Sequence, residues 1–266
     1  MTKDDDADRA VRLAYDDRGD AGRVAWVTFN RPHQKNAIDQ AGKELFVDIM
    51  TGLRQDRTLR AVVLTGAGEE SFVGGTDIAQ MARFDFEQAE RSAYFMHRVC
   101  DVVRTCPIPV IARINGYCFG SGMEIAACAD LRVAATHAKF GMPEVRLGVP
   151  AGMEAAILPR LIGWGKAREM MLTGDTLTAE QAFQMGYLQK LVLASEIDNA
   201  VEAWLKSLLK CGARALRLQK RNMMFWEQMS LTDASRAGIN TFVDAYETDE
   251  PNRMMTAFVN RKRKTD

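Results

Sequence analysis

Hydrophobic and polar positions alternate in two early segments of the chain and then recur with helical spacing. Residues 11–15 alternate, and residues 24–29 form a β-branched and aromatic run that stops at Asn30-Arg31-Pro32. These patterns predict two paired strands followed by a turn. Asp39 suits a helix N-cap. Beyond it, an apolar residue recurs every four positions, which predicts a helix with one buried face lined by Ala41, Leu45, Ile49 and Leu53.

The middle of the chain alternates short apolar runs with helical patterns. The runs at residues 61–64, 109–114 and 131–134 predict buried strands. Between them lie a polar helix with Met96, Val99 and Val103 on one side and an apolar helix at residues 123–129. Strands that alternate with helices predict an α/β fold with a mostly parallel sheet and crossover helices.

Only helical patterns remain after about residue 194. We therefore divide the chain into an α/β core, residues 1–194, and a helical C-terminal region, residues 195–266. Several apolar faces of this region, such as the one with Phe242, Val243 and Tyr246, are expected to need another subunit to bury them.

Composition narrows the class of protein. The 266 residues are 47% hydrophobic, which suits one core with an appendage better than two equal domains. The 35 basic and 35 acidic residues balance, so no general attraction to nucleic acid or to an anionic membrane is expected. The five cysteines form no C-x-x-C pair and predict buried free thiols. The Asp-rich start lacks a targeting pattern and no apolar run could span a bilayer, so we expect a soluble, cytoplasmic protein.

Two glycine-containing loops each follow a strand and open a helix. The first carries Gly74, Gly75 and Thr76, and the second carries Gly120 and Ser121. Glycine lets the backbone approach a ligand, and the free N–H groups at a helix start favour a negatively polarised oxygen. Taken singly, each loop is a weak signal, and an ordinary turn is the favoured interpretation. Together the two loops could direct two N–H donors at one carbonyl oxygen, which is an oxyanion hole.

Two carboxylates accompany these loops. Glu124 lies in the first turn of the helix after the second loop, and Glu144 follows Phe140-Gly141-Met142-Pro143. One helix, one strand and a turn separate the two residues. A connection of this kind can bring both carboxylates to the same edge of a sheet. Such a pair suits acid and base chemistry beside an enolate. For a lone glutamate, a solvated surface position is the favoured interpretation.

Taken together, these segments resemble the crotonase (enoyl-CoA hydratase/isomerase) family. The order and spacing hold from about Val11 to the C-terminus. The matching segments include Asn30-Arg31-Pro32, Lys35-Asn36-Ala37, Phe72 to Ile78, Asn115-Gly116, Gly120 to Glu124, Phe140-Gly141-x-Pro143-Glu144 and Leu158-Pro159-Arg160-Leu161. The resemblance implies a spiral core of repeated ββα units and a helical C-terminal region that forms homotrimers or dimers of trimers.

The resemblance also implies an acyl-CoA ligand and roles for particular residues. The thioester oxygen would meet the backbone N–H groups of Thr76 and Ser121, where the family more often has Ala and Gly. Glu144 would protonate the α-carbon while Glu124 helps to activate the water that adds at the β-carbon. No metal or further cofactor is implied. Substrate and CoA contacts are expected at Lys35, Ala37, Gly74, Gly75, Asp77, Ile78, Gly120, Gly152 and Lys262.

The sequence departs from the family pattern after Pro150, where Met153-Glu154 replaces a glycine pair. Glu154 is then either a third active-site carboxylate that reads a polar acyl group or, as we favour, a helix N-terminal carboxylate. Arg113 replaces a residue that is usually small, and we have no functional account of it. Two basic clusters suit either the phosphates of coenzyme A or solvated helix faces: Arg214, Arg217, Lys220 and Arg221, and Arg261 to Lys264.

Hydration of an enoyl thioester is the leading hypothesis because the isomerases of the family keep only one of the two glutamates. Isomerisation, hydrolysis, decarboxylation and racemisation of a thioester would use the same oxyanion hole. A serine peptidase on a related fold would need a histidine and an aspartate beside Ser121. A member that binds RNA without turnover is disfavoured by the neutral net charge and the absence of RNA-reading motifs.

Overall fold

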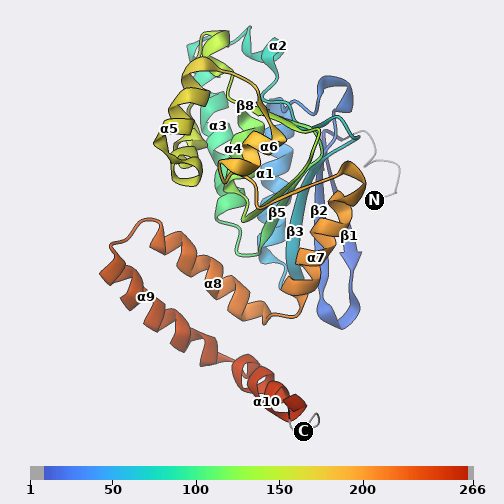
Figure 1. The fold of residues 1–266 in the computed structure, drawn as a ribbon, viewed down its shortest axis with the longest axis vertical. Helices are drawn as coiled ribbons and strands as arrows, with labels where there is room; N and C mark the ends of the chain where they lie inside the picture. Colours follow the sequence, from blue (N-terminus) through green and yellow to red (C-terminus); the bar gives the residue numbers. More distant parts are fainter. Residues whose placement is uncertain (1–8, 263–266) are drawn as a thin grey trace.

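The computed structural model describes residues 9–262, and the side chains of residues 9–260. Two β-sheets and the helices packed on them form the upper body in Figure 1, and three helices extend away below it. The strands are β1 (Val11–Asp17), β2 (Arg23–Phe29), β3 (Leu59–Gly66), β4 (Ser71–Val73), β5 (Val110–Ile114), β6 (Tyr117–Phe119), β7 (Leu131–Ala135), β8 (Lys139–Gly141), β9 (Leu177–Thr178) and β10 (Lys190–Val192). The α-helices are α1 (Gln40–Gln55), α2 (Ile78–Met81), α3 (Phe86–Arg104), α4 (Ser121–Cys128), α5 (Leu158–Thr173), α6 (Ala179–Gln184), α7 (Ile197–Leu209), α8 (Ala213–Trp226), α9 (Leu231–Asp244) and α10 (Glu250–Lys262).

The two sheets are built from a repeating unit. The larger sheet has the strand order β1-β2-β3-β5-β7-β10 and the smaller has β4-β6-β8-β9. The pairs β3 with β4, β5 with β6 and β7 with β8 each give their first strand to the larger sheet and their second to the smaller. A helical segment follows each pair, so the chain winds as a spiral of ββα units, which confirms the expected fold class.

The longer strands were predictable, whereas the smaller sheet was not. β1, β2, β3, β5 and β7 lie where the hydrophobic pattern placed them, and β1 pairs antiparallel with β2 as expected. β4, β6 and β8 pair in parallel with one another but have only three residues each. Three residues are too few to display a two-residue period, and glycines surround them.

Helix α1 begins as predicted, with the Asp39 side chain accepting a 2.8 Å hydrogen bond from the Gly42 N–H. Its buried face differs from the one inferred from a four-residue spacing. Ala41 is exposed, and the fully buried positions are Gly42, Lys43, Phe46, Val47, Met50 and Leu53. A strict four-residue step drifts about 40° around a helix at each repeat, so a buried stripe must mix steps of three and four. The correction places a lysine on the core side of α1.

Helix α7 packs on the outer face of the larger sheet. Its residues Ile197, Val201 and Leu205 form one apolar cluster with sheet residues that include Val63 and Ile111. Arg113 on β5 joins this contact, because its Nε donates a 2.6 Å hydrogen bond to Asp198 on α7. Arg113 therefore has a structural explanation. From residue 194 to residue 262 the chain forms helices joined by short connections, but it leaves the body of the protein only after α7 (Figure 1).

Basic residues of α8 attach the helical extension to the core. Lys220 is buried and donates hydrogen bonds of 2.7 Å to the Asp130 carboxylate and 3.1 Å to the Ile108 carbonyl. Arg217 donates to the carbonyls of Asp56 and Leu59. Arg214 forms an ion pair with Glu247, and Arg221 forms one with Asp244. All four basic residues of α8 that suited coenzyme A phosphates therefore have partners within the protein. The second basic cluster, Arg261 to Lys264, lies outside the residues whose side chains the structure describes. Among the described residues, no helix combines the length and apolar character needed to cross a membrane.

We expect Lys220→Met to lower the free energy of unfolding by roughly 2 kcal/mol, because it leaves the Asp130 carboxylate without its cation. The loss should be smaller than for a wholly buried pair, since Asp130 keeps some contact with water. Denaturant unfolding followed by circular dichroism, at one protein concentration, measures this change. Lys166→Met, which removes an exposed i,i+3 pair with Glu169, should change it by less than about 0.5 kcal/mol. Equal effects of the two variants would contradict the proposed attachment.

Candidate active site

A cavity of about 240 Å³ lies between the two glycine loops and helix α3. It brings together Thr76, Ser121, Glu124 and Glu144 from three separate segments of the chain, since Ser121 and Glu124 both lie on α4. Of the other residues expected to contact substrate, Gly74, Gly75, Ile78, Gly120 and Gly152 also line it. The rest of its wall is largely apolar and includes Met81, Phe84, Ala89, Ala93, Met96, Leu147, Val149, Pro150 and Met153.

The first glycine loop is held by backbone pairing with the segment before α1. Ile38 donates a 2.9 Å hydrogen bond to the Gly75 carbonyl and accepts one of 3.1 Å from the Asp77 N–H. Thr76 lies between these two bonds, so its own N–H faces the other way. Among the described residues, no backbone or side-chain acceptor takes that N–H. The loop therefore presents an unused donor.

The second glycine loop begins helix α4. Gly120 has a φ of 51° and donates a 2.9 Å hydrogen bond to the Gly141 carbonyl. A Cβ at Gly120 would lie 2.7 Å from the Glu144 Oε1, so only glycine fits here without displacing that carboxylate. Ser121 is the first helical residue, and its N–H has no partner within the helix.

The two loops meet through their side chains. The Thr76 hydroxyl donates a 3.2 Å hydrogen bond to the Ser121 hydroxyl. The two residues that depart from the usual Ala and Gly of the family thus link the loops that carry the expected donors. None of the three histidines, all within the described residues, hydrogen-bonds to Ser121. The arrangement that a serine peptidase would require is absent there.

Glu124 is enclosed in the first turn of α4, with 2% of its surface exposed. Its Oε1 accepts a 2.9 Å hydrogen bond from the Ala155 N–H. Burial, together with the charges of Glu144 and Glu154, raises the pKa of Glu124 to about 8 against the opposing effect of the Ala155 N–H. In the ligand-free protein this carboxyl group therefore holds its proton at neutral pH.

Glu144 begins the 3-10 helix η3 (Glu144–Leu147) and is half-buried. Its Oε2 is buried and has no hydrogen-bond partner among the described residues. Burial raises the pKa of Glu144 as well. Two carboxyl groups that repel each other in one cavity favour a state in which they hold a single proton between them. Such a pair contains both an acid and a base.

Glu154 does not line the cavity, although it is buried in the first turn of the 3-10 helix η4 (Met153–Ile157). Its Oε1 lies 2.6 Å from the Nδ1 of His97, and its Oε2 is buried without a partner among the described residues. Burial raises its pKa while His97 acts in the opposite direction. The geometry does not support direct contact of Glu154 with a polar acyl group.

Three of the expected coenzyme A contacts lie outside the cavity wall. The Lys35 Nζ lies 4.2 Å from the centre of the Tyr117 ring, and the Ala37 carbonyl accepts a hydrogen bond from Arg31. Asp77 is the N-cap of α2 and accepts a 3.1 Å hydrogen bond from Arg31. These residues shape the first loop. The side chain of Lys262 falls outside the described residues.

Sequence reasoning missed Lys43 and Ser92, which also line the cavity. Lys43 on α1 is 1% exposed, and its Nζ donates a 2.7 Å hydrogen bond to the hydroxyl of Ser92 on α3. Burial lowers the pKa of Lys43 to about 8, with Asp39 acting in the opposite direction. The signal was present in the sequence, since Lys43 stands three residues before Phe46 and four before Val47.

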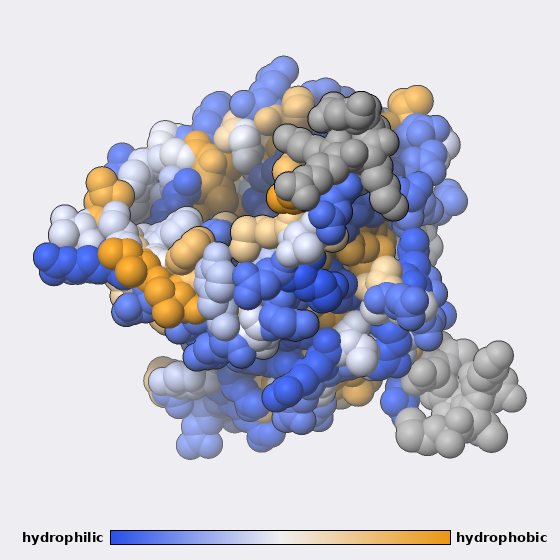
Figure 2. Space-filling view, turned by 90° about the horizontal axis from the view of Figure 1, so that it is seen from below, coloured by the Kyte–Doolittle hydropathy of each residue, from blue (hydrophilic) through white to orange (hydrophobic). Residues whose placement is uncertain are grey.

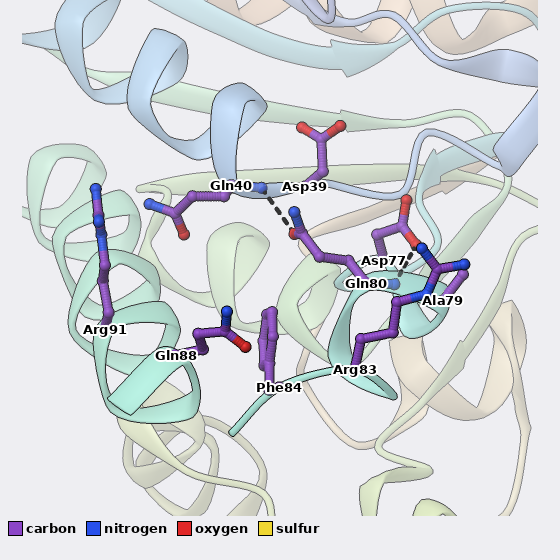
Figure 3. Close-up of a pocket in the computed structure, with 9 residues that line it drawn as sticks. All are labelled: Asp39, Gln40, Asp77, Ala79, Gln80, Arg83, Phe84, Gln88 and Arg91. Atoms are coloured by element: carbon purple, nitrogen blue, oxygen red, sulfur yellow. Dashed lines mark hydrogen bonds between the residues drawn. The ribbon is translucent and has the colours of Figure 1, made fainter. Parts of the chain in front are cut away.

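A second, more open pocket of about 560 Å³ adjoins this region on the outside. Figure 3 shows that it is surrounded by the start of α1, helix α2 and the start of α3, with the ring of Phe84 standing in it. The Gln40 N–H donates to the Gln80 side chain across its upper edge. Phe84 lines both pockets, so its ring forms part of the wall between them.

Comparison with known proteins identifies close relatives of this architecture. A sequence model of the enoyl-CoA hydratase/isomerase family matches residues 19–266. The crotonyl-CoA hydratase of Syntrophomonas wolfei is 32% identical over 242 residues, covering 91% of this chain and 93% of the relative. The short-chain-enoyl-CoA hydratase of Clostridium acetobutylicum is 31% identical over 243 residues, with 91% and 93% covered.

Solved structures agree with this result. The crystal structure of an enoyl-CoA hydratase from Bacillus anthracis superposes with a TM-score of 0.89 at 28% identity, covering 94% of this chain and 96% of that one. An enoyl-CoA hydratase from Mycobacterium smegmatis gives a TM-score of 0.88 at 26% identity, with the same coverage.

The raised pKa of Glu124 should make the free energy of unfolding depend on pH. Its folded-state pKa of about 8 exceeds the ordinary value of 4.5, so the native state binds this proton more tightly than the unfolded chain. The stability that this proton contributes is therefore present below about pH 4.5 and is lost as the pH rises to about 8. We expect the difference in unfolding free energy between wild type and Glu124→Gln to fall over this window, with a slope of at most about 1.4 kcal/mol per pH unit.

Denaturant unfolding at a series of pH values tests this expectation. Glu169→Gln changes an exposed glutamate on α5 and serves as the control. Its difference from wild type in unfolding free energy should not fall between pH 4.5 and pH 8 as it does for Glu124→Gln. A difference between wild type and Glu124→Gln that stays constant from pH 5 to pH 8 would show that Glu124 titrates normally.

Proposed function

The chain belongs to the enoyl-CoA hydratase/isomerase family, and we propose that it hydrates a 2-enoyl-CoA thioester to the 3-hydroxyacyl-CoA. One observation carries the choice of reaction: Glu124 and Glu144 line the same cavity as the two unused N–H donors. Addition of water to a conjugated double bond needs a base for the water, an acid for the α-carbon and a site for negative charge on the thioester oxygen.

The backbone N–H groups of Thr76 and Ser121 would accept that charge. Both belong to glycine loops whose geometry is fixed by backbone hydrogen bonds, so the donors need little reorganisation as the enolate forms. Because the donors are backbone groups, replacement of the usual Ala and Gly by Thr and Ser preserves them. The hydroxyl bond between the two side chains then holds the loops at a fixed separation.

The two glutamates would move the protons. A water molecule loses a proton to the ionised carboxylate as its oxygen bonds to the β-carbon, and the protonated carboxyl group gives its proton to the α-carbon. The pair holds one proton before and after the reaction, but on the other carboxyl group afterwards. Transfer of that proton between the two glutamates then restores the starting state, so no external acid, metal or redox cofactor is required. The family resemblance implies that Glu144 is the acid. Because Glu124 holds the proton in this structure, this role requires the proton to move from Glu124 to Glu144 when substrate binds.

The proposal predicts that Glu124→Gln and Glu144→Gln each lose about a hundredfold or more in kcat for crotonyl-CoA hydration. Glutamine keeps the size of the side chain and removes its acid and base functions. The fall in the ultraviolet absorbance of the conjugated thioester measures the rate, and Glu169→Gln on the surface of α5 should retain full activity. Loss in Glu144→Gln alone would favour an isomerase with a single proton-shuttling carboxylate.

The helical extension supports a proposal about assembly. Large apolar side chains are exposed along α8, α9 and α10, and Figure 2, seen from that end, shows apolar residues in orange among the hydrophilic ones. The set includes Met223, Phe225, Trp226, Leu231, Ile239, Phe242, Val243, Tyr246, Met255 and Val259. We propose that other copies of the chain bury this surface in a homotrimer or a dimer of trimers.

Light scattering coupled to gel filtration should therefore give three or six times the chain mass of 29.7 kDa. The double variant Ile239→Asp/Phe242→Asp places charges on one face of α9, where the two wild-type side chains are 65% and 67% exposed, and should lower that mass. Phe86→Asp changes an 82% exposed aromatic at the start of α3 and should leave it unchanged. A wild-type mass of one chain would exclude the assembly.

A further inference from the structure

Among the described residues that line the cavity, Lys43 is the one charged side chain that the proposed hydration does not use. It projects from the buried face of α1 into a wall that is largely apolar and includes Met81, Phe84, Ala93 and Met96. Its neighbour Ser92 comes from α3, the helix that packs against α1. The pair therefore makes a polar patch in the largely apolar wall of the cavity.

The charge of Lys43 is poorly compensated by the protein. An ammonium group has three donors, and the acceptors near this one are the Ser92 hydroxyl at 2.7 Å and the Ser92 carbonyl at 3.5 Å. No carboxylate of the described residues forms an ion pair with it within 4.0 Å. Asp39 is the acidic residue that acts on it through charge, but that carboxylate pairs with Arg31 at 3.1 Å.

A buried and unpaired ammonium destabilises the folded state, and a methionine or leucine at this position would pack without that cost. Desolvation is also what makes such a group bind an anion strongly, because a charge-assisted hydrogen bond gains strength where water is excluded. At neutral pH the group remains mostly protonated, since its pKa of about 8 lies above 7. Ser92 accepts from the lysine, which leaves its own O–H free to donate to a ligand.

We propose that Lys43 and Ser92 form a subsite for a carboxylate carried by the acyl group, so that the substrate is the CoA monothioester of an unsaturated dicarboxylic acid. The inference rests on the proposed function, which places the thioester at Thr76 and Ser121. With the thioester there, an acyl chain that fills the cavity runs along the α3 wall, where Ser92 lies. Its free carboxylate then accepts from the ammonium and from the hydroxyl.

The remaining charges of the cavity are consistent with this assignment. Glu124 and Glu144 are the other ionisable groups of its wall, and a pair that holds one proton carries a single negative charge. An anionic substrate would be repelled by that charge in a low-dielectric site, and the Lys43 ammonium offsets the repulsion. An uncharged acyl chain has no need of such a group.

Matched pairs of substrates test the subsite in the wild-type protein. Each pair has one chain length, with or without a terminal carboxylate: 2-pentenedioyl-CoA against 2-pentenoyl-CoA, 2-hexenedioyl-CoA against 2-hexenoyl-CoA, and 2-octenedioyl-CoA against 2-octenoyl-CoA. We expect kcat/KM to favour the dicarboxylic member at least about tenfold at one or more chain lengths. Preference for the uncharged member at every length would overturn the proposal.

Lys43→Met keeps the length of the side chain and removes the charge, so we expect it to fold and to be at least as stable as wild type. It should lower the ratio of kcat/KM for the dicarboxylic substrate to that for its uncharged partner by about tenfold or more, and Ser92→Ala should lower the same ratio by a smaller factor. Lys166→Met, at an exposed lysine of α5, should leave the ratio unchanged. Equal losses on both substrates of a pair in Lys43→Met would mean a structural role only.

Calorimetric binding of adipyl-CoA and hexanoyl-CoA separates this inference from the proposed hydration, because neither compound has a double bond to hydrate. The protein could bind adipyl-CoA more tightly than hexanoyl-CoA, lose this preference in Lys43→Met, and hydrate none of the enoyl substrates. That result would support the subsite and reject the hydration. Hydration of enoyl substrates with no dependence on the terminal carboxylate would keep the reaction and reject the subsite.

Discussion

The positions of the four groups that we propose take part in the reaction follow from the parallel pairing of three short strands. β4 leads into Thr76, β6 leads into Ser121 and α4, and β8 leads into Glu144. Neighbouring parallel strands end at the same edge of a sheet, so three segments that are far apart in sequence deliver their groups to one place. The Gly120 N–H to Gly141 carbonyl bond then sets α4, and with it Glu124, against the segment that carries Glu144. A slip of one residue in this sheet would turn the side chains to opposite faces and separate the pair.

How much of this was readable from the sequence depended on the length of each pattern. The five longer strands and the main helices have enough residues to show a hydrophobic period. The order of the sequence motifs indicated the family, and with it the two candidate glutamates. The smaller sheet is invisible to periodicity, although it is the part that assembles the site. Family motifs did not separate the residues of the cavity wall from those that support it: Asp77 and Ala37 both bond Arg31, and neither lines the cavity.

Lys43 was missed for a different physical reason. Lysine on a helix is usually solvated, and an apolar stripe drawn with a strict four-residue step placed it beside the buried face instead of on it. Tertiary packing decides the rotation of a helix, and α3 supplies the partner that makes burial of the ammonium possible. Glu154 shows the same limit, since its partner His97 is 57 residues away in the sequence and no local pattern connects them. Buried charges are identified by what surrounds them in space.

The cavity therefore concentrates ionisable groups whose charged forms are disfavoured by burial. Burial raises the pKa of Glu124 and Glu144, and that of the neighbouring Glu154, and it lowers the pKa of Lys43, so the fold carries an energetic cost at this place. For the glutamates this cost is linked to the proposed chemistry, because a carboxyl group that keeps its proton at neutral pH is an effective acid. The proposed hydration assigns no proton transfer to Lys43, and a methionine at this position would avoid the cost of a buried charge. The proposed carboxylate ligand explains this lysine, because the charge of the ligand would complete an ion pair that the protein leaves half-formed.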